Sequence, residues 1–395
     1  MSRFKKIAIG IVALIALAIL GVIIAGVMEP SVDPDFRADL IAADDATSRQ
    51  LIDSETRKLG ITALSVSVRT SDKPVRTEYF GRANPNGLMQ VASLSKAVAA
   101  AVIAMHAENQ GVGLDDDIRS QIKSLDIASL EGGDRPVTLR QLLSHTTGSS
   151  QSGYPGYPRD YEIPSTVDVI KDPPRWIESP LVFDGTPGEF RYSGGGYTIA
   201  QLWAEETSGK DFATLADELL LKPLRMDKST FAQPINPDEI APLSITGADV
   251  GFAPTEGVFS TLNDSWHNYP EQAAAGLWST TEDYSIFVQA LLSAAEGDES
   301  IIPATVARAM LEPIAVTEWW PEARYGLGIV VETKEDGKLA NVSHSGGNAG
   351  YRSFFLAQPK TVDQPMRIVT VIANTSSAAY LNREIAMALL ESKAD

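Results

Sequence analysis

The sequence contains no cysteine, and this absence removes several kinds of chemistry at once. Disulfide bonds, thiolate zinc sites, iron–sulfur clusters and cysteine nucleophiles are all excluded, as is a lipid-modified N-terminal cysteine. Histidine is scarce as well, with 4 in 395 residues and no His-Glu-x-x-His pair. An all-histidine metal site would use most of them, so we expect neither a metal ion nor another cofactor.

Positive charge is also in short supply. The chain has 33 Lys and Arg against 51 Asp and Glu, a formal net charge of −18. Nucleic acid is therefore not expected as a partner, because phosphate binding needs clustered basic side chains. No Gly-x-x-x-x-Gly-Lys-Ser/Thr or Gly-x-Gly-x-x-Gly string supports a nucleotide site. No Gly-x-Ser-x-Gly string supports the nucleophile turn of an α/β-hydrolase.

One long hydrophobic run stands at the N-terminus. The 22 residues from Ile7 to Met28 are all apolar, and Arg3, Lys5 and Lys6 precede them. A helix of that length measures roughly 33 Å, enough to cross a hydrocarbon core of about 30 Å. Positive charge stays on the cytoplasmic side, so we expect residues 1–28 to be a single-pass anchor in the cell membrane with the remainder outside. Cleavage as a signal peptide, giving a secreted protein, is the alternative.

The remaining chain predicts an α+β fold. Residues 29–35 form a linker, and 36–395 form one large domain, with a sheet region at 36–90 and 322–395 and an inserted all-α region at 91–321. Alternating, β-rich segments predict strands at Ile61–Val68, Val75–Phe80, Tyr325–Glu332, Arg352–Ala357 and Met366–Ile372. Periodic segments predict helices at Phe36–Leu59, Ala97–Glu108, Leu139–Ser144, Tyr197–Thr207, Phe212–Leu221, Thr281–Ala295 and Ala378–Ser392. Three of these helices are expected to end near Gly111, Gly209 and Gly297. The strands at both ends would pair into one antiparallel sheet flanked by helices.

A stretch rich in proline, tyrosine and glycine runs from residue 149 to residue 187. It is either the rim of a site, carrying Tyr154, Tyr157, Tyr161 and Trp176, or a structural surface loop. Both interpretations stay open at the level of sequence.

The first string that carries chemistry is Ser93-Leu-Ser-Lys96. Ser-x-x-Lys alone is weak, and a second match occurs at Ser120–Lys123. Ser93, however, opens a long helix rich in Ala, Val and Ile, and a lysine one turn later projects from the same face. The helix N-terminus also favours developing negative charge. Ser120 follows an acidic stretch and precedes no such helix, so we interpret it as solvated surface.

Three further strings follow in order. They are LLSHTTG at 142–148, Tyr192-Ser-Gly, and His344-Ser-Gly-Gly-Asn. Each has a structural explanation of its own, because glycine clusters are usually turns and a single histidine is usually structural. His145 in particular is expected to hold a turn. The four strings in this order are much harder to explain that way.

Together these strings resemble the serine β-lactamase and penicillin-binding-protein superfamily, and most closely its class C-like branch of esterases and D-amino-acid peptidases. The resemblance runs from about residue 36 to the C-terminus. Ser93-x-x-Lys96 matches the nucleophile motif, Tyr192-Ser-Gly194 stands where the family has Tyr-x-Asn, and His344-Ser-Gly stands where β-lactamases have Lys-Thr-Gly.

The resemblance implies a role for each matching residue. Ser93 would attack a carbonyl and form an acyl-enzyme. Lys96 would take its proton, which requires a pKa lowered from about 10.4 toward 7, a cost of roughly 4–5 kcal/mol. Tyr192 would relay protons and activate the deacylating water. The backbone N–H groups of Ser93 and Gly347 would form the oxyanion hole, and His344 would bind the acyl or carboxylate end of the substrate.

Two departures from the motif bear on the substrate. Gly194 lacks the amide of Tyr-x-Asn, and His344 is not a permanent cation as lysine is. The expected function is therefore hydrolysis of a small-molecule or peptide ester or amide, as an esterase or peptidase, with β-lactamase activity as the alternative. The sequence is also compatible with a membrane-anchored sensor that acylates without turnover, or with a catalytically inactive envelope protein. It does not predict an oligomeric state.

Overall fold

The computed structural model describes residues 31–174, 179–235, 253–255, 258–260, 266–298, 300–317 and 323–392. The predicted anchor at residues 1–28 lies outside these ranges and stays a prediction. Across the part of the chain that is described, no helix is long and apolar enough to span a bilayer.

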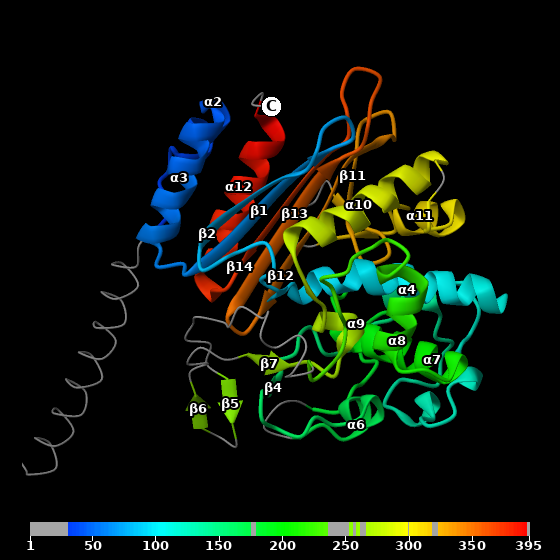
Figure 1. Ribbon diagram of the computed structural model, residues 1–395. Helices are drawn as coiled ribbons and strands as arrows, with labels where there is room; N and C mark the ends of the chain where they lie inside the picture. Colours follow the sequence, from blue (N-terminus) through cyan, green and yellow to red (C-terminus); the bar gives the residue numbers. More distant parts are fainter. Residues whose placement is uncertain are drawn as a thin grey trace, which may run out of the picture.

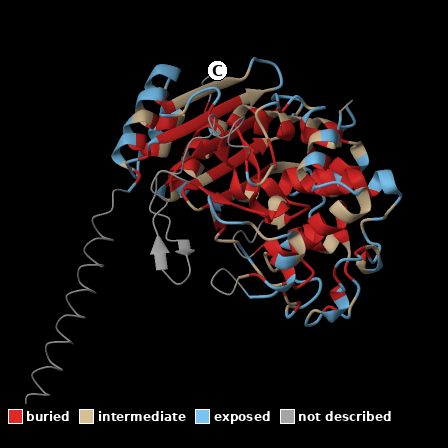
Figure 2. Ribbon diagram, turned by 60° about the horizontal axis from the view of Figure 1, so that its bottom comes forward, coloured by how far each residue is buried: buried red, intermediate tan, exposed pale blue. Residues whose placement is uncertain are grey.

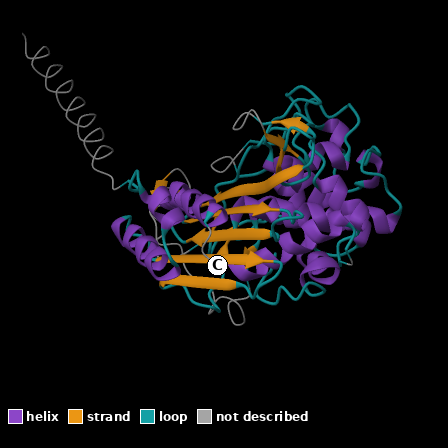
Figure 3. Ribbon diagram, turned by 90° about the horizontal axis from the view of Figure 1, so that it is seen from above, coloured by secondary structure: helices purple, strands orange, loops and turns teal. Residues whose placement is uncertain are grey.

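The centre of the fold is an antiparallel sheet of eight strands, built from both ends of the chain (Figures 1 and 3). Its order is β2-β1-β14-β13-β12-β11-β10-β9. The two N-terminal strands form a hairpin, and β1 pairs on its other side with β14, the last strand of the chain. This confirms the predicted α+β class and the joining of the two termini in one sheet. The strands are β1 Ala63–Thr70, β2 Arg76–Gly81, β9 Ala315–Val316, β10 Ala323–Tyr325, β11 Val330–Thr333, β12 Leu339–Asn348, β13 Tyr351–Gln358 and β14 Arg367–Ala373.

Helices cover both faces of this sheet. In Figure 1, α2, α3 and α12 lie to the left of the sheet and α10 lies to its right. The contacts agree, since α12 packs on β13 and β14 while α10 packs on β14 and β1. The helices in chain order are α2 Phe36–Ala42, α3 Asp45–Lys58, α4 Ser95–Gln110, α5 Leu139–Leu143, α6 Thr166–Lys171, α7 Gly194–Ser208, α8 Phe212–Ala216, α9 Gln272–Ala275, α10 Thr281–Glu296, α11 Ala304–Met310 and α12 Ala379–Glu391.

The alternation in β1 explains how the two faces form. Leu64, Val66 and Val68 are buried in the core beneath α12. The intervening serines point the other way, and Ser65 Oγ lies 2.8 Å from Thr281 Oγ1 at the start of α10. A period of two along a strand thus gives one apolar face and one face whose hydroxyls fix the opposite helix.

The second and larger core lies between the sheet and the helical half of the molecule. Its central element is α4, which is buried continuously from Ser95 to Ala107. A helix that is apolar on all sides belongs in the interior, and Figure 2 shows buried residues running through the sheet and this half. Helices α4, α7 and α10 end, as predicted, on glycines in the left-handed conformation, Gly111, Gly209 and Gly297.

Three predicted elements differ from the structure. Tyr325–Glu332 is not one strand but the hairpin of β10 and β11, because Gly326 N–H bonds Ile329 O and Gly328 has φ +78°. Phe36–Leu59 is two helices, since the Asp44 side chain caps a new helix by accepting from Thr47 N–H. Phe212–Leu221 is α8 followed by a π-helix, Asp217–Leu221.

The inserted region is not made of helices alone. The short strands β3 Met89–Gln90 and β8 Trp278–Ser279 pair with each other, as do β4 Tyr157–Pro158 and β7 His267–Asn268. The strands β5 Ala253–Thr255 and β6 Val258–Ser260 form a third pair. The tyrosine-rich stretch therefore contributes structure through β4, where Tyr157 is fully buried. Trp176 lies outside the described residues.

Candidate active site

Ser93 lies in a tight turn where the helical half meets the sheet. The turn is a 3₁₀ helix, Ala92–Leu94, directly ahead of α4, and Ala92 adopts φ +51°. A non-glycine residue in this left-handed region costs roughly 1–3 kcal/mol and needs surrounding contacts to hold it. Ser353 Oγ donates to Val91 O at 2.6 Å, and Ser95 Oγ donates to Ala92 O at 2.5 Å. The strained turn leaves Ser93 partly exposed while its neighbours are buried.

Lys96 lies one helical turn further along and reaches back to Ser93. Its Nζ is 3.2 Å from Ser93 Oγ and donates to Ala274 O at 2.7 Å. Only 2% of the residue is exposed. Burial lowers the pKa of the Lys96 amine to about 7, because the charged form loses its hydration. Near neutral pH a large share of this amine is uncharged and able to accept a proton.

Tyr192 completes the group from a distant part of the chain. It directly precedes Ser193, the N-cap of α7, whose Oγ accepts from Gly196 N–H at 3.1 Å. The Tyr192 ring centroid lies 4.9 Å from Lys96 Nζ. Burial raises the pKa of the Tyr192 phenol, and a side-chain hydrogen bond with Ser93 opposes this rise. Ser93, Lys96 and Tyr192 therefore converge at one place.

The end of β12 forms the opposite wall. Strand β11 pairs with β12 only as far as Ser343, so the residues from His344 onward have an edge that β11 does not cover. Gly346 lies against the Ser93 turn, and a Cβ there would meet Val91 O at 2.4 Å and Ser353 Oγ at 2.3 Å. Only glycine permits so close an approach of strand and turn. Gly347 follows it on the uncovered stretch and is exposed.

Asn348 joins this strand end to the helical half. Its Nδ2 donates to Gln90 Oε1 at 2.7 Å and to Ala275 O at 3.1 Å. Gln90 Nε2 in turn donates to His267 O at 2.7 Å. These buried amides hold β12, α9 and the strands before Ser93 in one arrangement, so the wall of the site is rigidly placed.

The expected role of His344 does not match its surroundings. The residue is only 4% exposed, and both ring nitrogens are engaged within the protein. Nδ1 donates to Ser345 O at 2.7 Å, and Nε2 accepts from Tyr325 Oη at 2.9 Å. Burial, with Lys96 nearby, lowers the pKa of His344 to about 3. The imidazole is therefore neutral near pH 7 and already bonded at both nitrogens, so it offers no positive charge to a substrate carboxylate; its expected role in substrate binding stays a prediction.

A permanent cation does stand near this edge, and sequence reasoning missed it. Arg352 pairs with Gly347 across β12 and β13, and a Cβ on Gly347 would lie 2.9 Å from Arg352 Nη1. The same nitrogen donates to Asn348 O and Tyr351 O, each at 2.9 Å. Finding Arg352 from the sequence required the register of the hairpin, which no local signal provides.

A side chain at position 194 would not fit without movement of a neighbouring ring. A Cβ at Gly194 would lie 2.8 Å from Cε2 of Tyr154. Tyr154 Oη is 2.7 Å from Thr198 Oγ1 on α7. The ring of Tyr154 thus occupies the space that a side chain at position 194 needs. The tyrosine-rich stretch thus packs against the start of α7, two residues after Tyr192.

The rival Ser-x-x-Lys match lies elsewhere. Ser120 and Lys123 are both exposed, and Lys123 uses its backbone N–H to bond Glu206. Among the residues that the structure describes, no cluster of three or more His, Asp or Glu side chains is placed to hold a metal ion.

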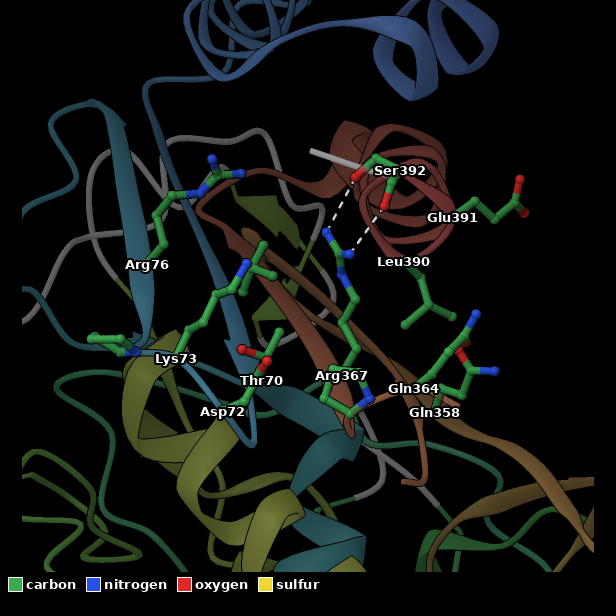
Figure 4. A pocket seen from close by; sticks show the side chains of 13 residues that line it. Thr70, Asp72, Lys73, Arg76, Gln358, Gln364, Arg367, Leu390, Glu391 and Ser392 are labelled. Carbon is green, nitrogen blue, oxygen red and sulfur yellow. Dashed lines mark hydrogen bonds between the residues drawn. The ribbon is translucent and has the colours of Figure 1, made fainter. Parts of the chain in front are cut away.

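A separate hollow of about 680 Å³ lies at the other end of the sheet (Figure 4). Arg367, Thr70 and Gln358 line it, and Arg367 donates to Ser392 O and Oγ. Ser353 contacts the Ser93 turn, and Ile372 and Ser65 lie opposite it on the neighbouring strands. Along the same three strands, the residues that line the hollow are five positions further on. Five residues of strand span about 16 Å, so this hollow is distinct from the candidate active site.

Solved structures of other proteins share this fold. The octameric penicillin-binding protein homologue from Pyrococcus abyssi superposes with a TM-score of 0.67 at 22% identity, covering 88% of this chain and 77% of that one. The D-amino acid amidase from Ochrobactrum anthropi SV3, complexed with L-phenylalanine amide, gives a TM-score of 0.65 at 17% identity, covering 88% of this chain and 98% of that one. At these identities the likeness establishes the fold alone.

Sequence comparison identifies the family. "Protein flp" of Staphylococcus aureus (strain N315) is 23% identical over 341 residues, which is 83% of this chain and 62% of that protein. The chain thus spans less than two thirds of that relative's length. The sequence model of the Beta-lactamase family matches residues 48–392, nearly the whole region that carries the sheet, the Ser93 turn and α12. The chain belongs to the beta-lactamase family.

Proposed function

We propose that this protein is a serine hydrolase that cleaves an ester or amide through an acyl-enzyme on Ser93. The observation that carries the proposal is the Lys96 amine, 3.2 Å from Ser93 Oγ and with its pKa lowered to about 7 by burial. A buried lysine that is about half neutral at pH 7, beside a partly exposed serine, is the arrangement that activates a hydroxyl nucleophile. Burial of a lysine disfavours its charged form and so costs stability, which a role in proton transfer would explain.

The acylation step follows from this geometry. Ser93 Oγ attacks the substrate carbonyl carbon while its proton passes to Lys96 Nζ. Negative charge develops on the carbonyl oxygen, which the N–H groups of Ser93 and Gly347 would stabilise, each worth about 3–4 kcal/mol. The proton is then delivered to the leaving alcohol or amine as its bond to the carbonyl carbon breaks. Tyr192, hydrogen-bonded to Ser93, is placed to relay it.

Deacylation uses the same groups in reverse. A water molecule attacks the ester carbon of the acyl-enzyme and loses its proton to the Lys96–Tyr192 pair. The bond to Ser93 Oγ breaks, and the proton returns to that oxygen. General-base assistance of this kind contributes about 10²–10⁴-fold.

Substrate class is inferred from the walls of the site. Gly194 offers no amide to a substrate side chain, and Tyr154 fills that space. We therefore favour a simple ester or a peptide amide over a β-lactam. Arg352 beside Gly347 supports a second candidate, because a guanidinium at this edge suits a substrate with a carboxylate, as in β-lactams and peptide C-termini.

Hydrolysis of p-nitrophenyl butyrate tests the proposal. Wild-type protein should release p-nitrophenol, Ser93→Ala should not, and the control Ser120→Ala should match wild type because Ser120 is exposed surface. Labelling by a fluorophosphonate without product release would indicate an acylating sensor, and no labelling would indicate an inactive envelope protein. Rapid nitrocefin hydrolysis would move the assignment to β-lactamase.

A further inference from the structure

The segment that carries Tyr192 is held on both sides by one residue, His145, which the sequence alone predicts only to hold a turn. We propose that His145 is the positioning residue that fixes the Tyr192 phenol against Ser93 and Lys96. The inference rests on the proposed function, since it assigns the residue that holds the proton-relaying phenol of that reaction in place.

The contacts form a clamp around Tyr192. The backbone N–H of Arg191, just before it, donates to His145 O at 2.8 Å. The backbone N–H of Ser193, just after it, donates to His145 Nδ1 at 3.0 Å. One residue thus satisfies the two amides that flank the tyrosine, once with its main chain and once with its ring. Neither amide can move without losing a bond to His145.

The ring of His145 also packs on the tyrosine itself. Its centroid is 4.3 Å from that of Tyr192 and 4.7 Å from that of Tyr325, which in turn bonds His344. Only 1% of His145 is exposed. Tyr192 is therefore confined by a buried aromatic surface as well as by the two backbone bonds.

The charge state of His145 is compatible with its role as a hydrogen-bond acceptor for the Ser193 N–H. Nδ1 can receive the Ser193 N–H only when it carries no proton, so the neutral tautomer with its hydrogen on Nε2 is required. Burial, together with Lys96 and His344, places the pKa of His145 well below 6.5. A neutral ring also avoids a second positive charge beside Lys96.

The backbone at His145 limits which residues could do this. Its φ is +60°, a left-handed conformation in which asparagine, aspartate and histidine are enriched. Asparagine is the informative substitute, because its Oδ1 is attached to Cγ as Nδ1 is and it accepts hydrogen bonds. Leucine is of similar bulk but accepts none and is strained at this φ. Comparing the asparagine and leucine variants therefore shows whether residue 145 must accept a hydrogen bond or need only fill space.

Displacement of Tyr192 is the expected consequence of losing the clamp. A misplacement of about 1 Å can cost roughly 10²-fold in rate. His145→Leu should therefore lower kcat/KM for p-nitrophenyl butyrate about 10²-fold, and His145→Asn should recover at least tenfold of that loss. The same two substitutions at His106, a buried histidine that bonds Thr207 Oγ1, provide the control. Both should leave kcat/KM within about threefold of the wild-type value.

A double-mutant cycle shows whether His145 acts through Tyr192. In a Tyr192→Phe background, where the phenol is already absent, His145→Leu should cost less than about threefold because the two effects are coupled. Equal losses in both backgrounds would overturn the proposal and make His145 a general structural residue. So would an asparagine variant as impaired as the leucine variant.

Hydrogen exchange keeps this inference separate from the proposed function. His145→Leu should speed exchange of the amide at 193, because it removes the Nδ1 acceptor, and His145→Asn should protect that amide. The amide at 191, which bonds the main-chain oxygen of residue 145, is the internal reference in both variants. If the wild-type protein neither hydrolyses the ester nor reacts with a fluorophosphonate, the hydrolase proposal fails. Hydrogen exchange in the His145 variants still tests whether His145 holds the backbone around Tyr192. Unchanged exchange in His145→Leu would overturn the clamp whatever the activity.

Discussion

Replacing Lys96 with methionine should abolish activity and stabilise the fold. Burial lowers the Lys96 pKa from 10.5 to about 7. At pH 7 about half of the amines are neutral, whereas an unshifted lysine would be neutral in only about 3 of 10,000 molecules, so the shift raises the supply of base about 10³-fold. Methionine fills the same space without a base, and acylation should fall at least 10³-fold.

The same shift carries a cost in stability whose sign follows from proton linkage. Between pH 7 and 10.5 the unfolded chain holds a proton on Lys96 that the folded protein has released, so stability rises with pH across that window. At and below pH 7 the penalty is greatest, at most about 5 kcal/mol for the 3.5-unit shift. Lys96→Met removes this penalty and should raise the free energy of unfolding most at low pH.

Two measurements check the argument. The rate of fluorophosphonate labelling of wild type should rise with pH and level off above an inflection near 7. Urea unfolding at pH 6.5 and pH 9.5 should show Lys96→Met more stable than wild type, by a margin that shrinks at the higher pH. A labelling rate that keeps rising to pH 10, or a methionine variant less stable than wild type at pH 6.5, would refute the reasoning.

Four further outcomes are expected. Tyr192→Phe should lower kcat by about 10²–10⁴-fold in steady-state ester assays, because the phenol acts in proton transfer; a loss below threefold would remove that role. Gly346→Ala should destabilise the protein by about 1–3 kcal/mol and abolish labelling, since its Cβ would meet Val91 O at 2.4 Å, while Gly153→Ala, with open space around it, should do neither. Glu271 is fully buried, and burial raises its pKa to about 8. The folded protein then keeps a proton that the unfolded chain releases, so the free energy of unfolding should fall by several kcal/mol as the pH rises from 4.5 to 8. Urea unfolding of Glu271→Gln should show a weaker dependence on pH, and an unchanged slope would contradict the assignment. The full chain should sediment with membranes when residues 1–28 are retained, and a soluble mature N-terminus near residue 27 would favour the cleaved signal peptide.

Local signals were enough to predict most elements of the fold. Alternation placed β1, β13 and β14 within two residues, and glycines placed the ends of α4, α7 and α10. Errors arose where one continuous pattern spanned a turn. The segment around Gly328 is β-rich throughout, and only its positive φ divides it into a hairpin. The Asp44 cap divides the first predicted helix in the same way.

The site was predictable only in part, because its residues come from distant segments. The serine, lysine and tyrosine strings pointed to one chemistry, and the structure brings those three residues together. What the sequence could not provide depends on register and packing. Arg352 meets Gly347 through the pairing of β12 with β13, and His344 becomes neutral through burial that no motif reveals.

Mass spectrometry of the fluorophosphonate-treated protein tests the central claim most directly. The account predicts one adduct, on the peptide that contains Ser93, formed in wild type and in Ser120→Ala and absent from Ser93→Ala. An adduct on any other serine, or a wild-type protein that stays unmodified across pH 6 to 9, would contradict it.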